Sequence, residues 1–127
     1  MSMPKSVLIV DDAAFIRMMI RDILANEGYA IHEAVNGRDA LEKYSEARSD
    51  LVIMDIMMPE MNGLAALRAI RDRDPDARIV IVSAMTDRPV IDEALRRGAM
   101  AFVSKPFQPT RVRETVRTCL SSPPPGV

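Results

Sequence analysis

Acidic side chains directly follow two short apolar runs of this sequence. Asp11 and Asp12 come after the run VLIV at 7–10, and Asp55 comes after LVIM at 51–54. Two carboxylates about 4 Å apart repel by about 4 kcal/mol at an effective dielectric constant of 20, so a cluster of them needs a cation. Mg²⁺ takes oxygen ligands, and an aspartate is also an established covalent nucleophile for phosphoryl groups. These residue types point to metal-assisted phosphoryl chemistry on an aspartate.

A hydroxyl and an ammonium group stand at equivalent places further along the chain. Ser83 follows the apolar run at 79–82, and Lys105, which precedes Pro106, follows the segment 100–104. An ammonium can pair with one phosphoryl oxygen as a point charge, and a hydroxyl can donate to another. One aspartate at a strand end is more often a cap or turn residue. The five polar residues together make a phospho-aspartate site, with a Mg²⁺ ion that shares a phosphoryl oxygen.

The apolar runs predict the strands that position these side chains. Runs at 7–10, 51–54 and 79–82 do not alternate with polar residues, which is typical of strands covered on both faces, and such strands are usually parallel. Weaker candidates at 29–35 and 100–104 bring the predicted number of strands to five.

Helical patterns separate the predicted strands. Gly28 and Gly98 stand where the first and fourth helices should end, and Pro89 and Pro109 where the fourth and fifth should begin. The order predicts an α/β fold: (βα)5, a doubly wound parallel five-stranded sheet of the flavodoxin-like type with right-handed crossovers. In such sheets the ligand site lies beyond the carboxyl ends of the strands, so the five polar residues should meet at one edge. The apolar positions that carry the helical spacing are Ile16, Met19, Ile20, Ile23 and Leu24; Ala40, Leu41, Tyr44 and Ala47; Gly63, Ala66, Leu67 and Ile70; Ile91, Ala94 and Leu95; and Val112, Val116, Cys119 and Leu120.

Length and composition limit the domain organisation and the cellular setting. A chain of 127 residues is the common size of one domain, which we place at 1–120, and SSPPPGV at 121–127 reads as a disordered tail or a cut linker. Lysine plus arginine number 17 and aspartate plus glutamate 18, so direct nucleic-acid binding is not expected. One cysteine, no apolar run of membrane-spanning length and no signal peptide favour a soluble cytoplasmic protein without membrane insertion.

Several conspicuous residues favour a structural interpretation. The ten methionines suit irregular gaps in a core. His32, Tyr44 and Cys119 are expected to pack rather than to react. Arginines on the last two helices predict either a solvated face or a docking surface for an acidic partner; they are Arg96, Arg97, Arg111, Arg113 and Arg117.

Four segments between about residues 5 and 120 resemble one family. VLIVDD, DIMMPEMNG, IVIVSAM and FVSKPFQP resemble the receiver domains of two-component response regulators, especially the single-domain chemotaxis regulators. The resemblance implies that Asp55 takes a phosphoryl group from a sensor histidine kinase and that Asp11 and Asp12 bind Mg²⁺. It also implies a signalling domain rather than an enzyme, one that assists its own phosphorylation and dephosphorylation.

The same resemblance implies further roles. The main-chain carbonyl of Met57 would be a metal ligand beside Asp55, and Ser83 and Lys105 would contact the phosphoryl group. Phe102, where many chemotaxis members carry tyrosine, would swing inward on activation. The surface of helix four, strand five and helix five would then bind a downstream protein, such as a flagellar motor switch or a phosphatase, with the regulator itself a monomer.

Functions of other classes fit less well. A haloacid-dehalogenase-like phosphatase also has an aspartate nucleophile after a strand, but it carries a second aspartate two positions on, where this chain has Met57. A flavodoxin-like FMN carrier would bind a phosphate dianion in its first loop, and Asp11 and Asp12 would repel it. Within the family, a chemotaxis messenger, a phosphorelay intermediate and a receiver module of a longer transcriptional regulator all stay open.

Overall fold

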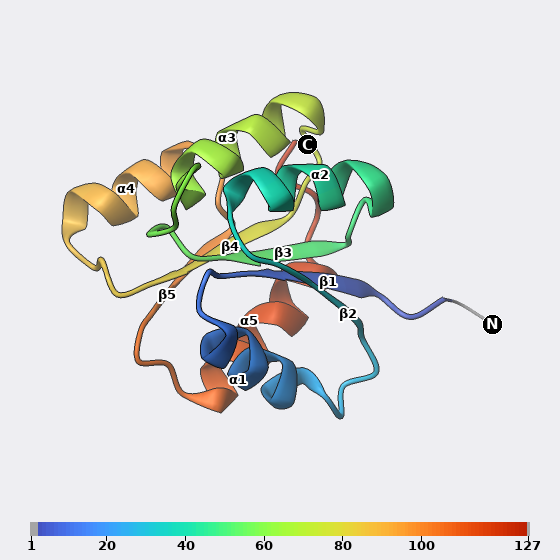
Figure 1. Cartoon of the computed structure of the whole chain (residues 1–127). Helices are drawn as coiled ribbons and strands as arrows, with labels where there is room; N and C mark the ends of the chain where they lie inside the picture. The colour runs from blue at the N-terminus through green and yellow to red at the C-terminus, as the bar shows by residue number, and fades with distance from the viewer. Residues whose placement is uncertain (1–2, 127) are drawn as a thin grey trace.

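The computed structural model describes residues 3–126, in which five strands and five helices alternate along the chain (Figure 1). No helix in this part of the chain combines the length and apolar character needed to cross a membrane. The strands are β1 (Ser6–Val10), β2 (Ala30–Ala34), β3 (Leu51–Met54), β4 (Ile79–Ser83) and β5 (Ala101–Ser104). The helices are α1 (Ala14–Leu24), α2 (Gly37–Ala47), α3 (Gly63–Arg73), α4 (Arg88–Arg96) and α5 (Pro109–Ser121).

The strands form one parallel sheet in the order β2-β1-β3-β4-β5. The chain starts inside the sheet, moves outward to β2 and then returns to β3 on the other side of β1. This reversal makes the carboxyl ends of β1 and β3 the usual ligand position of a doubly wound sheet. The predicted fold class is confirmed.

Each face of the sheet is covered by helices, α1 and α5 on one face and α2, α3 and α4 on the other (Figure 1). Neighbouring strand residues therefore enter different cores: Leu8 and Val10 pack in one cluster, and Val7 and Ile9 in the other. This double burial is why the apolar runs do not alternate with polar residues. Cys119 lies buried in the cluster beneath α5, and burial raises the pKa of its thiol.

Local sequence sets most helix ends as predicted. Pro109 is the first residue of α5, and Pro89 is the second of α4. Gly98, with φ +106°, follows α4 in the left-handed region that favours glycine. The first helix differs, because α1 ends at Leu24 and two tight turns, with Ala25 N–H donating to Asp22 and Glu27 N–H to Leu24, lead on to Gly28.

The carboxyl-terminal helix ends at Ser121, one residue beyond the predicted domain end. The carbonyl of Ser122 accepts a hydrogen bond from Arg78 Nη2 at 2.9 Å, which ties the end of α5 to the start of β4. The disorder expected of the tail stays a prediction, and Val127 lies outside the described residues.

Candidate functional site

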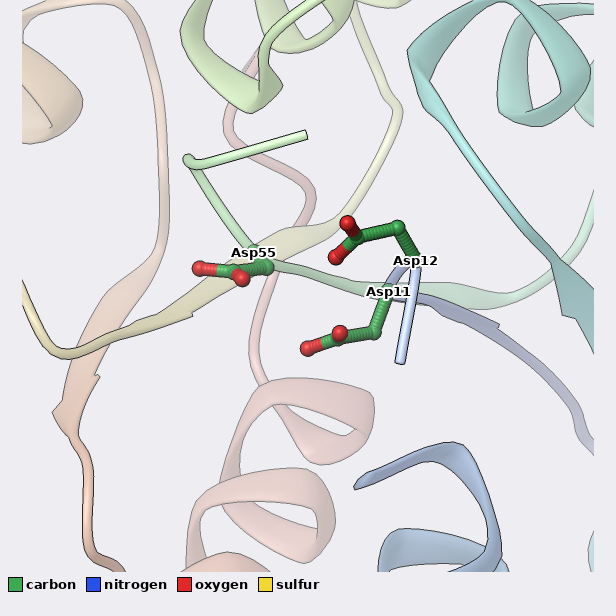
Figure 2. A group of neighbouring side chains, drawn as sticks. All are labelled: Asp11, Asp12 and Asp55. Atoms are coloured by element: carbon green, nitrogen blue, oxygen red, sulfur yellow. The ribbon is translucent and has the colours of Figure 1, made fainter. Parts of the chain in front are cut away.

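Three aspartates meet where β1 and β3 end (Figure 2). One ligand oxygen from each of Asp11, Asp12 and Asp55 lies within 4.8 Å of the others. The carboxylates project in the same general direction from the ends of their strands (Figure 2). Asp11 and Asp55 are buried, with 3% and 7% of their surface exposed, whereas Asp12 is exposed.

The backbone fixes the two buried aspartates by extending the parallel ladder one residue beyond each strand. Asp11 N–H donates to the carbonyl of Ala34 at 3.2 Å, and Asp55 N–H donates to the carbonyl of Val10 at 3.1 Å. Their Oδ1 atoms accept from nearby backbone, from Ala13 N–H at 2.9 Å and from Ile56 N–H at 2.7 Å. These bonds orient both side chains and leave each Oδ2 for other partners.

Lys105 supplies that partner for both aspartates. Its Nζ donates to Asp11 Oδ2 at 2.9 Å and to Asp55 Oδ2 at 3.2 Å. Burial alone would lower the pKa of the Lys105 ammonium, but the bonds and charges of Asp11 and Asp55 outweigh it and hold the pKa above its usual value. The lysine is therefore positively charged at neutral pH and bridges the two buried carboxylates.

The donor set fits a divalent cation. Three carboxylates face one ammonium, which leaves two negative charges without a counterion in the cluster. Mg²⁺ takes oxygen ligands, and a charge of +2 would balance the cluster. Asp11, Asp12 and Asp55 would hold such an ion, whose positive charge would offset their mutual repulsion. The predicted participation of the Met57 main-chain carbonyl stays a prediction.

Besides Met57, two predicted residues, Ser83 and Phe102, lie outside this contact cluster. Ser83 ends β4, is fully buried, and its Oγ accepts from Met85 N–H at 3.1 Å. Its carbonyl accepts from Lys105 N–H at 2.9 Å, so the hydroxyl-bearing residue and the lysine are neighbours through the backbone. Phe102 lies on β5, half-buried against the core under α2, α3 and α4.

The positioning roles of two residues, Arg17 and Gly63, were not predicted from the sequence. Arg17 Nη1 donates to the carbonyl of Asp11 at 2.7 Å, and its Nε donates to Glu33 at 2.9 Å. Burial would raise the pKa of Glu33, but bonds from Arg17 and from Arg21 outweigh it and hold the pKa below its usual range. Both arginines project from α1 one turn apart, a spacing that would have revealed the pair once β2 was placed beside β1.

Gly63 is the second of these positioning residues. A Cβ atom at this position would overlap the carbonyl oxygen of Asp55, so only glycine lets α3 start this close to the end of β3. Gly63 N–H also donates to the carbonyl of Ile56 at 2.8 Å, which closes the intervening loop on itself.

That loop exposes methionine. The side chain of Met57 is 63% exposed and lines, with Asp12 and Met85, a cavity of about 530 Å³ beside the acidic cluster. The prediction that methionines fill the core holds for Met54, which is fully buried. It is wrong for Met57 and for Met18, which is 52% exposed on α1, because these positions fall outside both packed faces of the sheet.

Comparison with known proteins gives consistent results. The family model described as response regulator receiver domain matches residues 7–117. The chain is 53% identical to the chemotaxis protein CheY of Thermotoga maritima, over 90% of this chain and 96% of that protein. It is 49% identical to the chemotaxis protein CheY of Bacillus subtilis, over 94% and 100%. Among solved structures, the CheX–CheY–BeF3–Mg complex from Borrelia burgdorferi contains a chain similar at a TM-score of 0.91 and 32% identity, covering 94% of this chain and 92% of that one.

Proposed function

Because this chain belongs to the response regulator receiver family, we propose that Asp55 accepts a phosphoryl group from a sensor histidine kinase in a Mg²⁺-dependent reaction. An Asp55 carboxylate oxygen forms the new bond to phosphorus as the bond from phosphorus to the imidazole nitrogen of the donor breaks. The electron pair of that bond leaves with the imidazole. The observation that carries this proposal is a buried Asp55 whose Oδ2 already pairs with Lys105 inside an acidic cluster.

The surrounding residues have separate tasks in this proposal. Asp11, Asp12 and Asp55 would hold Mg²⁺ together with the main-chain carbonyl of Met57, and the bound ion would supply positive charge beside the transferred group. Lys105 moves from its carboxylate partners to a phosphoryl oxygen, where its ammonium acts as a point charge. The same groups assist later hydrolysis of the bond between Asp55 and phosphorus. The domain itself carries the phosphoryl group as a signal, so we describe it as a signalling domain rather than an enzyme.

The output is the second part of the proposal. The 53% identity to a chemotaxis protein supports a chemotaxis messenger, which we propose acts as a cytoplasmic monomer. A relay intermediate and a module of a longer regulator are the alternatives. The downstream protein, a flagellar motor switch component or a phosphatase, binds the surface formed by α4, β5 and α5. Ser83 and Phe102 connect that surface to the phosphoryl group. Chemotaxis receptor and kinase genes beside this gene would support the same assignment.

Intact-mass analysis tests the chemistry. Incubation with acetyl phosphate and Mg²⁺ should add one phosphoryl group that is stable in acid and labile in base. Asp55→Asn should abolish the labelling, whereas Asp50→Asn, at the other end of the same strand, should retain it because Asp50 bonds to Ser6 far from the cluster. Full labelling of Asp55→Asn, or labelling without any divalent ion, would contradict the mechanism.

A further inference from the structure

A second charged site lies between α3 and α4, on the face of the sheet that these helices cover (Figure 1). It is a cavity of about 500 Å³ with strongly polar walls. Four arginines and two acids line it, which leaves a net charge of +2. The lining residues are Arg68, Arg71 and Asp72 from α3, and Glu93, Arg96 and Arg97 from the end of α4.

Arg71 is the unusual member of this group. Its Nε and Nη1 atoms are buried and have no hydrogen-bond partner within residues 3–126. A Cβ at Gly98 would lie 2.8 Å from Arg71 Nε, so the guanidinium rests on the glycine that follows α4. The negative end of the α4 dipole offsets part of its charge. Two guanidinium donors without a partner are costly, and the partly exposed Arg71 side chain, which lines the cavity, retains hydrogen-bonding capacity for an anion.

The other arginines differ in how fully they are engaged. Arg96 and Arg97 both pair with Glu93, at 3.4 and 3.3 Å. In the part of the chain that the structure covers, neither Arg68 nor Arg71 makes an ion pair. Each side of the cavity carries a net charge of +1, but within residues 3–126 the arginines without an ion pair lie on the α3 side.

The arginines of α5 present the opposite case. Arg117 pairs with Glu27 near the end of α1 at 2.8 Å, and Arg111 Nη2 donates to the carbonyl of Phe102 at 3.5 Å. An acidic partner would have to compete with these contacts on α5. It would meet free donors between α3 and α4.

We propose that the α3–α4 cavity docks an acidic segment of a partner protein, with a carboxylate of that segment bound by Arg71 and Arg68. The planar guanidinium matches a carboxylate, which can accept two parallel hydrogen bonds. An extended segment suits the cavity better than a compact polyanion, because Asp72 and Glu93 in the walls would repel dense negative charge. The site goes beyond the proposed phosphoryl chemistry, and its binding does not require Asp55 to be phosphorylated.

Titration with a hexaglutamate peptide at low ionic strength tests the proposal, with affinity from calorimetry and the binding site from the Nε–H signals of the arginines by NMR. The Arg71 signal should shift. The double variant Arg68→Gln/Arg71→Gln should bind about tenfold more weakly, which corresponds to about 1.4 kcal/mol. Arg73→Gln is the matched control for each charge removed, since Arg73 lies on α3 but donates to Ser45 on α2, and it should change affinity by less than about twofold.

A variant of opposite effect keeps the test decisive if the arginine variants fail to fold. Glu93→Gln should tighten binding by about threefold, because it releases Arg96 and Arg97 from their pairs and removes a repulsive charge. An unchanged or weaker affinity would overturn the proposal. So would an equal loss in Arg73→Gln, which would indicate only a diffuse surface field. Tighter binding of tripolyphosphate than of the peptide at the Arg71 signal would replace the docking site by a small-anion site.

Discussion

The two ends of the central sheet treat acidic residues in opposite ways. At the amino ends of the strands two acids have their own donors: Asp50 accepts from Ser6 N–H at 2.8 Å and from Ser6 Oγ at 3.3 Å, and Asp74 accepts from Tyr44 Oη at 2.6 Å. At the carboxyl ends three carboxylates cluster beside one ammonium, that of Lys105, which pairs with Asp11 and Asp55. Saturated acids stabilise a fold, whereas undercompensated acids keep the capacity to bind a cation and a phosphoryl group.

The largest expected difference between the two ends is the response to Mg²⁺. A ligand that binds only the folded state stabilises it by about 2.7 kcal/mol at a hundredfold excess over its Kd. Mg²⁺ should therefore raise the melting temperature of the protein. Asp12→Ala should remove most of this rise and remain folded, since Asp12 is exposed. Asp11→Ala should lose the rise as well.

Asp50→Ala is the control at the amino end and should keep the full Mg²⁺ response. Thermal denaturation with and without the ion measures all four proteins. An unchanged response in both Asp11→Ala and Asp12→Ala would place the metal elsewhere.

The next expected effect is a conformational change that extends from the phosphorylated Asp55 to α4 and α5. We predict that Ser83 Oγ, which now accepts from Met85 N–H, moves to donate to the phosphoryl group, and that the rearranged loop then makes room for Phe102 to turn inward. Additional burial of Phe102 is worth on the order of 1 to 3 kcal/mol, enough to shift a two-state equilibrium by one to two decades. Amide NMR spectra with beryllofluoride, a phosphoryl mimic, should show shifts from Asp55 through residues 84–117.

Those shifts should be much smaller in Ser83→Ala, and Tyr44, Asp50 and Asp74 at the amino end should stay unchanged in both proteins. Shifts confined to the residues of the acidic cluster would leave phosphorylation intact but exclude this relay to α4 and α5.

A matched pair of alanine substitutions should change stability in opposite directions when no metal is present. Asp12→Ala removes a repulsion that amounts to about 1 kcal/mol for charges 4.8 Å apart in water, so the free energy of unfolding should rise. Asp50→Ala leaves Ser6 without its acceptor and should lower the free energy of unfolding by about 1 kcal/mol. Urea denaturation in the presence of a chelator measures both. A loss of stability in Asp12→Ala would mean that the acidic cluster is not under repulsion.

The smallest expected effect is a pH dependence of the stability contributed by Tyr44, near the amino ends of the strands. Burial, with added contributions from Asp74, holds the pKa of Tyr44 well above its usual value of 10.0. The resulting stability is present below pH 10.0 and declines as the pH rises further, because the unfolded protein then ionises Tyr44 while the folded protein does not. Tyr44→Phe should cost about 1 kcal/mol at pH 7.

That cost should shrink above pH 10.0. Denaturant titrations of both proteins between neutral and alkaline pH measure the difference. A difference that stays constant across this range would contradict the assigned hydrogen bond and burial of Tyr44.

The sequence predicted the features that follow from the periodicity of single elements and from the topology rules that order these elements. Doubly buried strands produce unbroken apolar runs, so the sheet and the meeting of Asp11, Asp55 and Lys105 at its carboxyl edge followed from known topology rules. The end of α1 at Leu24 was not predicted. Two tight turns follow the helix, and their residues continue the helical sequence pattern although the helix itself has ended.

Features that depend on how the side chains of two elements pack together were not predicted. Arg17 reaches Asp11 and Glu33 only because α1 crosses the sheet at a particular angle. The cavity around Arg71 depends on the relative rotation of α3 and α4, which neither helix encodes alone. Exposure of Met57 likewise depends on how its loop closes at Gly63.

The reactivity of the buried Cys119 reports on the local opening of α5. Cys119 lies on the buried face of α5 and is 5% exposed, and its raised pKa keeps the thiol protonated and slow to react. A thiol reagent must therefore wait for α5 to lift from the sheet. The ratio of the modification rate to that of an unfolded control gives the equilibrium constant of this local opening, and the free energy of opening follows from that constant. A change that loosens or tightens the packing of α5 can thus be measured from the modification rate of Cys119 in the protein without substitutions.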